Sequence, residues 1–81
     1  MHIVYILLSR QHPRRYYIGI TENLTNRLKE HNDCKTGYAK QYAPWVVETT
    51  IEFKDKKLAY AFEKYLKSGS GNAFLRKRFL P

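Results

Sequence analysis

Two residues of one predicted helix, Arg27 and His31, occupy positions where an amphipathic helix usually carries apolar side chains. The segment YYIGITENLTNRLKEH, residues 16–31, begins with a strand-like run and continues with a helical pattern. Turning each helical residue by about 100° places Leu24 and Leu28 on one stripe, and Arg27 and His31 fall within it. His31 follows Arg27 by one turn, so the two side chains can share a site.

Each of these two residues has both a chemical and an ordinary structural explanation. The rigid guanidinium fork of Arg27 fits a phosphate bidentately, but an arginine can also lie along the apolar edge of a helix with its charge in water. An unperturbed histidine pKa of about 6.5 suits proton transfer near neutrality. A histidine at a helix C-terminus also interacts favourably with the helix dipole. The residues alone leave both explanations open.

The composition favours a polyanionic partner. Fifteen Lys and Arg residues against seven Asp and Glu give the 81-residue chain a net charge of +8, which predicts contact with nucleic acid. The basic residues are spread along the chain, which disfavours a membrane surface. No apolar run approaches the roughly 20 residues that cross a bilayer. The single cysteine, Cys34, excludes an internal disulfide and is typical of a reducing compartment, so we expect a cytoplasmic protein.

The strands and helices expected from the sequence indicate a single small α+β domain over residues 1–81, which would position these residues. Three runs rich in β-branched and aromatic residues are expected to be strands, at residues 2–9, 16–21 and 46–53, with Pro13 between the first two. Helices are expected at residues 22–32, 56–67 and 73–80, with a loop at 32–45. The order ββαβαα indicates a three-stranded, mainly antiparallel sheet flanked by helices.

Polar residues at the predicted helix starts resemble N-caps. We assign this role to Thr21, Asp55 and Asn72, with Glu22 in the first turn of the first helix. The second helix is expected to bury a stripe formed by Leu58, Phe62, Tyr65 and Leu66. Glu63 lies off that stripe, where it would form a solvated i,i+4 pair with Lys67. Trp45 is expected to anchor the preceding loop in the core.

Two short sequence motifs resemble those of a known family. VYI at residues 4–6 and YIG at residues 17–19 resemble the paired signature of the GIY-YIG nucleases. The resemblance continues, in the family's order, through Arg27, His31, Glu63 and Asn72. Val4 stands where the family often has glycine, but Tyr5 supplies the relevant side chain. Family enzymes usually attach this module to a separate DNA-binding domain, and the chain is most similar to small stand-alone bacterial members.

The resemblance implies metal-dependent hydrolysis of a phosphodiester bond, and we expect the nucleic acid to be DNA, with RNA as the alternative. Tyr5 and Tyr17 would handle the attacking water and its proton, and His31 is a further candidate for the general base. Arg27 would stabilise charge on the phosphate. Glu63 would hold one divalent cation, Mg²⁺ or Mn²⁺, through a hard carboxylate oxygen. Asn72 would hold the phosphate or a metal-bound water, as an alternative to capping a helix.

Further residues are expected to contact the nucleic-acid backbone. Gly19 would let the substrate approach the strand closely. Basic residues of the last two helices would contact phosphates, namely Lys64, Lys67, Arg76, Lys77 and Arg78. Two alternatives to an independent nuclease remain. One is a non-catalytic basic module that binds nucleic acid, and the other is a nuclease domain that needs a partner protein for specificity. A homodimer is also possible on this basis.

Overall fold

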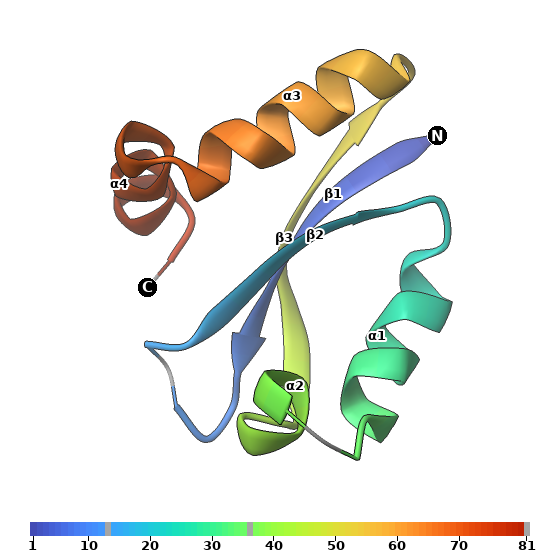
Figure 1. Ribbon diagram of the computed structural model, residues 1–81, viewed down its shortest axis with the longest axis vertical. Coiled ribbons are helices and arrows are strands. Elements are labelled where there is room, and N and C mark those ends of the chain that lie inside the picture. Colours follow the sequence, from blue (N-terminus) through green and yellow to red (C-terminus); the bar gives the residue numbers. More distant parts are fainter. Residues whose placement is uncertain (13, 36, 81) are drawn as a thin grey trace.

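A three-stranded antiparallel sheet lies at the centre of the computed structural model, which describes residues 1–12, 14–35 and 37–80 (Figure 1). The central strand β1 (His2–Ser9) pairs antiparallel with β2 (Tyr16–Thr21) and with β3 (Trp45–Phe53), in the order β2-β1-β3. This confirms the predicted α+β class and antiparallel sheet. Pro13, expected between the first two strands, lies outside the described residues.

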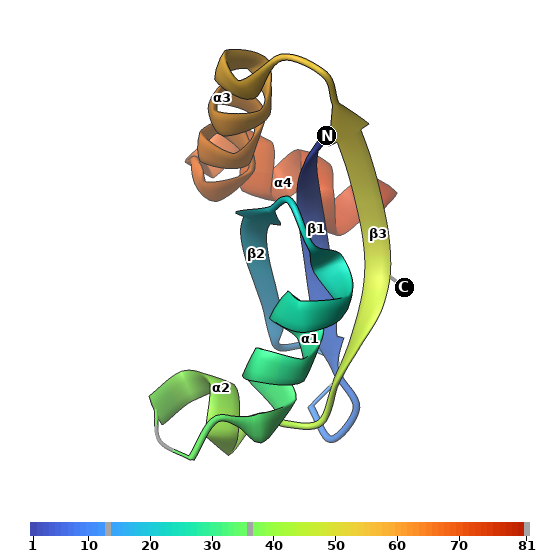
Figure 2. The same cartoon turned by 90° about the vertical axis from the view of Figure 1, so that its right-hand side faces the viewer.

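Helices cover both faces of the sheet. On one side lie α1 (Leu24–Asp33) and the short α2 (Gly37–Gln41), and on the other lie α3 (Lys56–Lys67) and α4 (Gly69–Arg78), as Figures 1 and 2 show. Among the described residues, no helix combines the length and apolar character that crossing a membrane requires. The central strand is therefore covered from both directions, and its residues from Val4 to Ser9 are buried.

Alternate residues of β1 divide the interior into two cores, because successive side chains of a strand point to opposite faces. The core on the α3–α4 side contains Val4, Ile6, Ile18, Ala59, Leu66 and Leu75. The core on the α1–α2 side contains Tyr5, Leu7 and Trp45, with Tyr17, Leu24 and Leu28 packed against it. The two signature tyrosines therefore belong to the face that α1 covers.

The first helix begins later than predicted, and its cap is a different residue. Asn23, not Thr21, is the N-cap, because its side chain accepts a hydrogen bond of 3.1 Å from the backbone nitrogen of Asn26. Thr21 is instead the last residue of β2, and its hydroxyl accepts a bond from the backbone nitrogen of Asn23. Glu22 precedes the helix, so it does not lie in the first turn as expected. The predicted cap of α3 is confirmed, since Asp55 accepts from Lys57 N at 2.8 Å.

The last helix begins earlier than predicted, because Ser68 caps it. The hydroxyl of Ser68 accepts from the backbone nitrogen of Gly71, and the nitrogen of Asn72 donates to the Ser68 carbonyl at 2.8 Å. Asn72 is thus a helical residue within α4, and its predicted role as N-cap is wrong. Ser68 is also the C-cap of α3, with its backbone N–H donating to the Tyr65 carbonyl. One residue therefore joins the two helices without a linker.

The buried face of α3 differs from the predicted stripe. Ala59 and Leu66 are fully buried, whereas Leu58 is 59% exposed and Tyr65 is 42% exposed. Residues 59, 63 and 66 follow the i, i+4, i+7 spacing of one helix face, so Glu63 turns toward the sheet. Its side chain is only 18% exposed. The buried stripe was misplaced in the sequence-based prediction because the bulky apolar residues were given more weight than Ala59. The small side chain of Ala59 allows close packing of α3 on the sheet.

The segment predicted as a loop, residues 32–45, contains the short helix α2. Trp45 anchors it as expected, since its side chain is buried and its indole N–H donates to the Ala39 carbonyl at 2.8 Å. The amide of Asn32 bonds both the backbone nitrogen and the carbonyl of Trp45. A helix of five residues is too short to give a periodic pattern in the sequence, which is why it was missed.

Two glycines beside Ser68 offer a matched test of the close contact between α3 and α4. A side-chain carbon on Gly71 would overlap the Tyr65 carbonyl oxygen, whereas one on Gly69 would meet nothing within 4 Å. We expect Gly71→Ala to lower the free energy of unfolding by about 1–3 kcal/mol or more, because backbone atoms must move. Gly69→Ala should change it by less than about 1 kcal/mol. Urea denaturation of both variants measures this, and equal stabilities would contradict the contact.

Candidate active site

The tyrosine and histidine side chains of the signature meet beneath α1. A hydrogen bond of 3.2 Å joins the Tyr5 hydroxyl and Nε2 of His31. The Tyr17 ring lies 4.3 Å from the His31 ring, measured between centroids. Tyr5 and Tyr17 come from neighbouring strands, and His31 comes from the last turn of α1. The structure thus brings together three residues of which the first and last, Tyr5 and His31, are 26 positions apart in the sequence.

Gly19 makes room for Tyr5. The two residues are directly opposite in the β1–β2 pairing, and a side-chain carbon on Gly19 would overlap the Tyr5 phenol. The sequence predicts that substrate backbone uses this space, but the structure gives the space to the Tyr5 ring. Because β2 is an edge strand, the hydroxyl of a residue on the central strand reaches across to the edge of the sheet.

The charge of Arg27 acts on both partners of the Tyr5–His31 bond. Burial raises the pKa of Tyr5 above its usual value, and the nearby positive charge of Arg27 opposes that shift. Burial lowers the pKa of His31, and here the Arg27 charge acts in the same direction. Near neutral pH the hydroxyl is therefore protonated and the imidazole is neutral. The Arg27 side chain is 42% exposed, and its Nε lies 3.8 Å from a carboxylate oxygen of Glu30.

Glu63 approaches the same edge from the opposite face of the sheet. Its helix, α3, packs against both β1 and β2. The negative charge of Glu63 is among the causes that raise the pKa of Tyr5, after burial as the largest. Lys67 Nζ donates to Oε2 of Glu63 at 3.3 Å. The i,i+4 ion pair expected as the structural alternative is therefore present, although Glu63 faces the sheet rather than solvent.

The described residues contain no cluster of three or more His, Cys, Asp or Glu side chains placed to hold a metal ion. A cation at Glu63 would have one protein carboxylate, with water and substrate phosphate as further ligands. Mg²⁺ usually keeps several waters and binds through one or two carboxylates plus phosphate, so the donor set fits it. The Lys67 ammonium competes for the same oxygen. The free protein should therefore bind such a cation weakly.

Asn72 lies at the other end of β2. Its side-chain amide donates a hydrogen bond to the Tyr16 hydroxyl, and Tyr16 is the first residue of β2, three positions before Gly19. The structure therefore brings Asn72 to the edge strand, but not to the Tyr5–His31 pair. This bond attaches α4 to β2.

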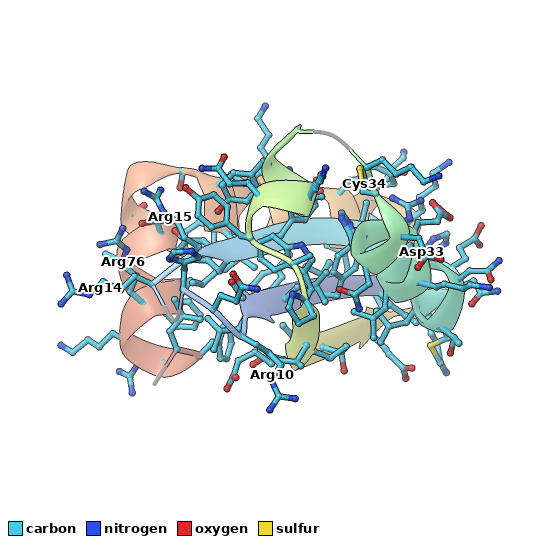
Figure 3. All side chains as sticks on the ribbon, turned by 90° about the horizontal axis from the view of Figure 1, so that it is seen from below. Arg10, Arg14, Arg15, Asp33, Cys34 and Arg76 are labelled. Atoms are coloured by element: carbon cyan, nitrogen blue, oxygen red, sulfur yellow. The ribbon has the colours of Figure 1, made fainter. Side chains whose placement is uncertain are left out.

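The basic residues predicted to contact phosphates are all exposed: Lys64, Lys67, Arg76, Lys77 and Arg78. Arg14 and Arg15, which the sequence analysis did not single out, follow the first strand and lie near Arg76 in the folded protein (Figure 3). The only sequence signal was their positive charge. No rule of spacing relates residues that are some sixty positions apart, so only the tertiary structure could reveal this proximity.

Comparisons with known proteins give one family and two similar proteins. The model of the GIY-YIG catalytic domain matches residues 1–77. The structure-specific endonuclease subunit SLX1 of Debaryomyces hansenii is 36% identical over 70 residues, covering 78% of this chain and 20% of that protein. The chain thus spans about a fifth of this relative's length. A solution NMR structure of a UPF0213 protein from Bacillus halodurans aligns with a TM-score of 0.56 and 26% identity, covering 94% of this chain and 82% of that chain.

The lowered pKa of His31 predicts a loss of stability in mild acid. The unfolded chain, in which the imidazole pKa is about 6.5, takes up a proton that the folded protein resists. The free energy of unfolding should therefore fall as the pH decreases below about 6.5, with no contribution from His31 above it. Chemical denaturation from about pH 5 to pH 8 should show a weaker decline for His31→Gln than for wild type. His12→Gln is the control, and identical profiles for wild type and His31→Gln would contradict the assignment.

Proposed function

The chain belongs to the GIY-YIG family of catalytic domains, and from this premise we propose that it is a divalent-metal-dependent endonuclease that hydrolyses phosphodiester bonds in DNA. The observation that supports this most directly is the cluster at the edge strand. There the Tyr5 hydroxyl and His31 Nε2 are 3.2 Å apart, and the charges of Arg27 and Glu63 both reach Tyr5.

Arg27 is the proposed electrostatic clamp. Hydrolysis of a phosphodiester increases negative charge on the phosphate oxygens, so a positioned cation lowers the barrier. The guanidinium is close enough to affect both Tyr5 and His31, yet its side chain is 42% exposed and so accessible to substrate. Its contact with the exposed Glu30, at 3.8 Å, is weak enough to be replaced by phosphate.

Tyr5 and His31 are proposed to move the proton as a pair. The raised pKa of Tyr5 disfavours a resting phenolate as the base. The His31 imidazole is neutral near pH 7, and in the tautomer that leaves Nε2 without a proton it can accept one from the Tyr5 hydroxyl. That hydroxyl then takes the proton of the attacking water. Because Tyr5 is fully buried, the water would approach beside Tyr17, which is partly exposed and is proposed to position it.

Glu63 is the proposed metal anchor, with Mg²⁺ or Mn²⁺ as the cation. When bound, such a cation supplies positive charge opposite the phosphate oxygens and lowers the pKa of a bound water. The contribution of Glu63 is a hard carboxylate oxygen fixed at the edge strand by the packing of α3. Lys67 balances that charge in the free protein, and in the complex we propose that it turns to a substrate phosphate. Lys64 is proposed to contact the backbone beside it.

The substrate is proposed to be recognised by its structure. The relative from Debaryomyces hansenii is named as a structure-specific endonuclease subunit, and by analogy we propose that this chain acts on a DNA structure, in the cytoplasm, with a partner protein that adds specificity. A cleavage screen over linear, flapped and branched DNA, with Mg²⁺, with Mn²⁺ and with a chelator, tests this. Binding without cleavage of any of these would favour the alternative of a non-catalytic module.

Glu63→Gln separates the metal anchor from the surface ion pair. The amide keeps the size of the side chain but loses the charge, so we expect cleavage to fall on the order of 100-fold or more. Metal-free DNA binding should persist or tighten, because one repelling charge is gone. The matched control is Glu52→Gln, an exposed glutamate of β3, which should cut normally. Cleavage by Glu63→Gln at the wild-type rate would mean that Glu63 only forms the ion pair with Lys67 and holds no metal.

Tyr5→Phe and Tyr17→Phe each delete one oxygen and keep the aromatic ring that packs against the sheet. A role in proton transfer predicts a rate loss of about a hundred- to ten-thousand-fold in at least one variant, Tyr5 more than Tyr17. Single-turnover cleavage and thermal melts provide the measurements. Tyr65→Phe, at an exposed position of α3, is the control. Near-wild-type rates in both variants would exclude the tyrosine mechanism and leave His31 as the base.

A further inference from the structure

Three arginines surround a hollow at the far end of β2 from Thr21. The hollow has a volume of about 800 Å³, and its lining includes Arg14, Arg15 and Arg76 together with Tyr16. Figure 3 shows the three arginines on one side of the molecule, where the chain after β1 lies near α4, while Arg10 points elsewhere. We call this feature, defined by Arg14, Arg15, Tyr16 and Arg76, the arginine hollow.

The charges of the arginine hollow are not balanced by neighbouring carboxylates. None of the described residues that line it is acidic. Within the described part of the chain, no ion pair involves any of its three arginines. Like charges gathered in one place repel each other, so such an arrangement suits an anion that neutralises them. Guanidinium groups pair bidentately with phosphate, which makes a phosphate the best match.

Arg15 is held in place by contacts within the protein before any ligand binds. Ser9 N donates to the Arg15 carbonyl at 3.0 Å, and Arg15 N donates to the His12 carbonyl at 2.8 Å. The Ser9 hydroxyl donates to the Tyr42 carbonyl at 2.6 Å. The Arg15 guanidinium lies 5.2 Å from the centre of the Tyr42 ring, a cation–π contact that orients it.

The third arginine is brought to the hollow by Asn72. Asn72 and Arg76 are four residues apart on α4, so they lie on the same face of the helix. The hydrogen bond from the Asn72 amide to the Tyr16 hydroxyl fixes that face against the start of β2.

The hollow and the catalytic cluster lie along the same edge strand. Tyr16 lines the hollow, and Gly19, beneath the Tyr5 phenol, follows three residues later. At about 3.3 Å per residue the two points are about 10 Å apart. Because the phosphates of a DNA strand also wind around the helix axis, neighbouring phosphates are farther apart than the axial rise of about 3.4 Å per nucleotide, so this spacing corresponds to about one to two nucleotides.

We propose that the arginine hollow is a second phosphate-binding site, which holds the backbone of the nucleic-acid substrate about one to two nucleotides from the bond that is cut. The inference rests on the proposed nuclease function, because that function identifies the phosphate as part of the substrate strand. Contacts of this kind set affinity and register and carry no sequence information. The hollow thus fixes where along a bound strand the cut falls.

The test measures binding with cleavage suppressed by a chelator. One triple variant carries Arg14→Gln, Arg15→Gln and Arg76→Gln. The control removes the same charge at exposed positions elsewhere, with Arg10→Gln, Lys35→Gln and Lys54→Gln. Fluorescence anisotropy with labelled single-stranded and duplex DNA of about 20 nucleotides gives the affinity at several salt concentrations. Thermal melts verify that both variants fold.

We expect the arginine variant to lose at least about tenfold more affinity than the control, and its salt slope to fall by about 2 to 3. Equal losses in the two triple variants would overturn the proposal, as would a wild-type protein that binds neither DNA. Cleavage by wild type is scored separately. Arginine-dependent binding without cleavage of any DNA would refute the nuclease function and support the phosphate site. Cleavage by wild type, with equal losses of affinity in the two triple variants, would support the nuclease function and refute the phosphate site.

Discussion

The missing side chain at Gly19 is the constraint on which the candidate site depends. Tyr5 belongs to the central strand, where a side chain would ordinarily end in the core. Because nothing projects from Gly19, the phenol lies over β2 and its hydroxyl reaches the edge of the sheet. At that edge, side chains from the two faces of the sheet can approach the same point, with His31 on one face and Glu63 on the other.

Burial keeps the two hydrogen-bonded residues of the site, Tyr5 and His31, uncharged, while other residues carry the charges. It raises the pKa of Tyr5 and lowers the pKa of His31, so both remain uncharged near neutrality. The charges are carried by Arg27 and Glu63, which approach from different helices. A neutral hydrogen-bonded pair is suited to moving a proton, and the flanking charges are suited to phosphate and metal. Neither function requires a charge to be buried without a partner.

The sequence was informative where periodicity reflects burial and misleading where small residues decide the packing. It predicted the three strands and the inward direction of Arg27 and His31, since those follow from local spacing. It misplaced Glu63, because Ala59 contributes little hydrophobicity yet marks the buried face of α3. It also assigned Asn72 as a cap, because a local pattern cannot show that the amide bonds a hydroxyl 56 residues earlier. Contacts of that range arise only from the fold.

The junction at Ser68 has a consequence for how such a chain can evolve. Because a single residue ends α3 and begins α4, no flexible segment separates the helix of Glu63 from the helix of Arg76. Surface loops usually tolerate insertions and deletions, but one added residue at this corner would rotate and shift the whole of α4. The position of Arg76 relative to Glu63 thus depends on the turn at Ser68, although Ser68 itself takes no part in the proposed chemistry.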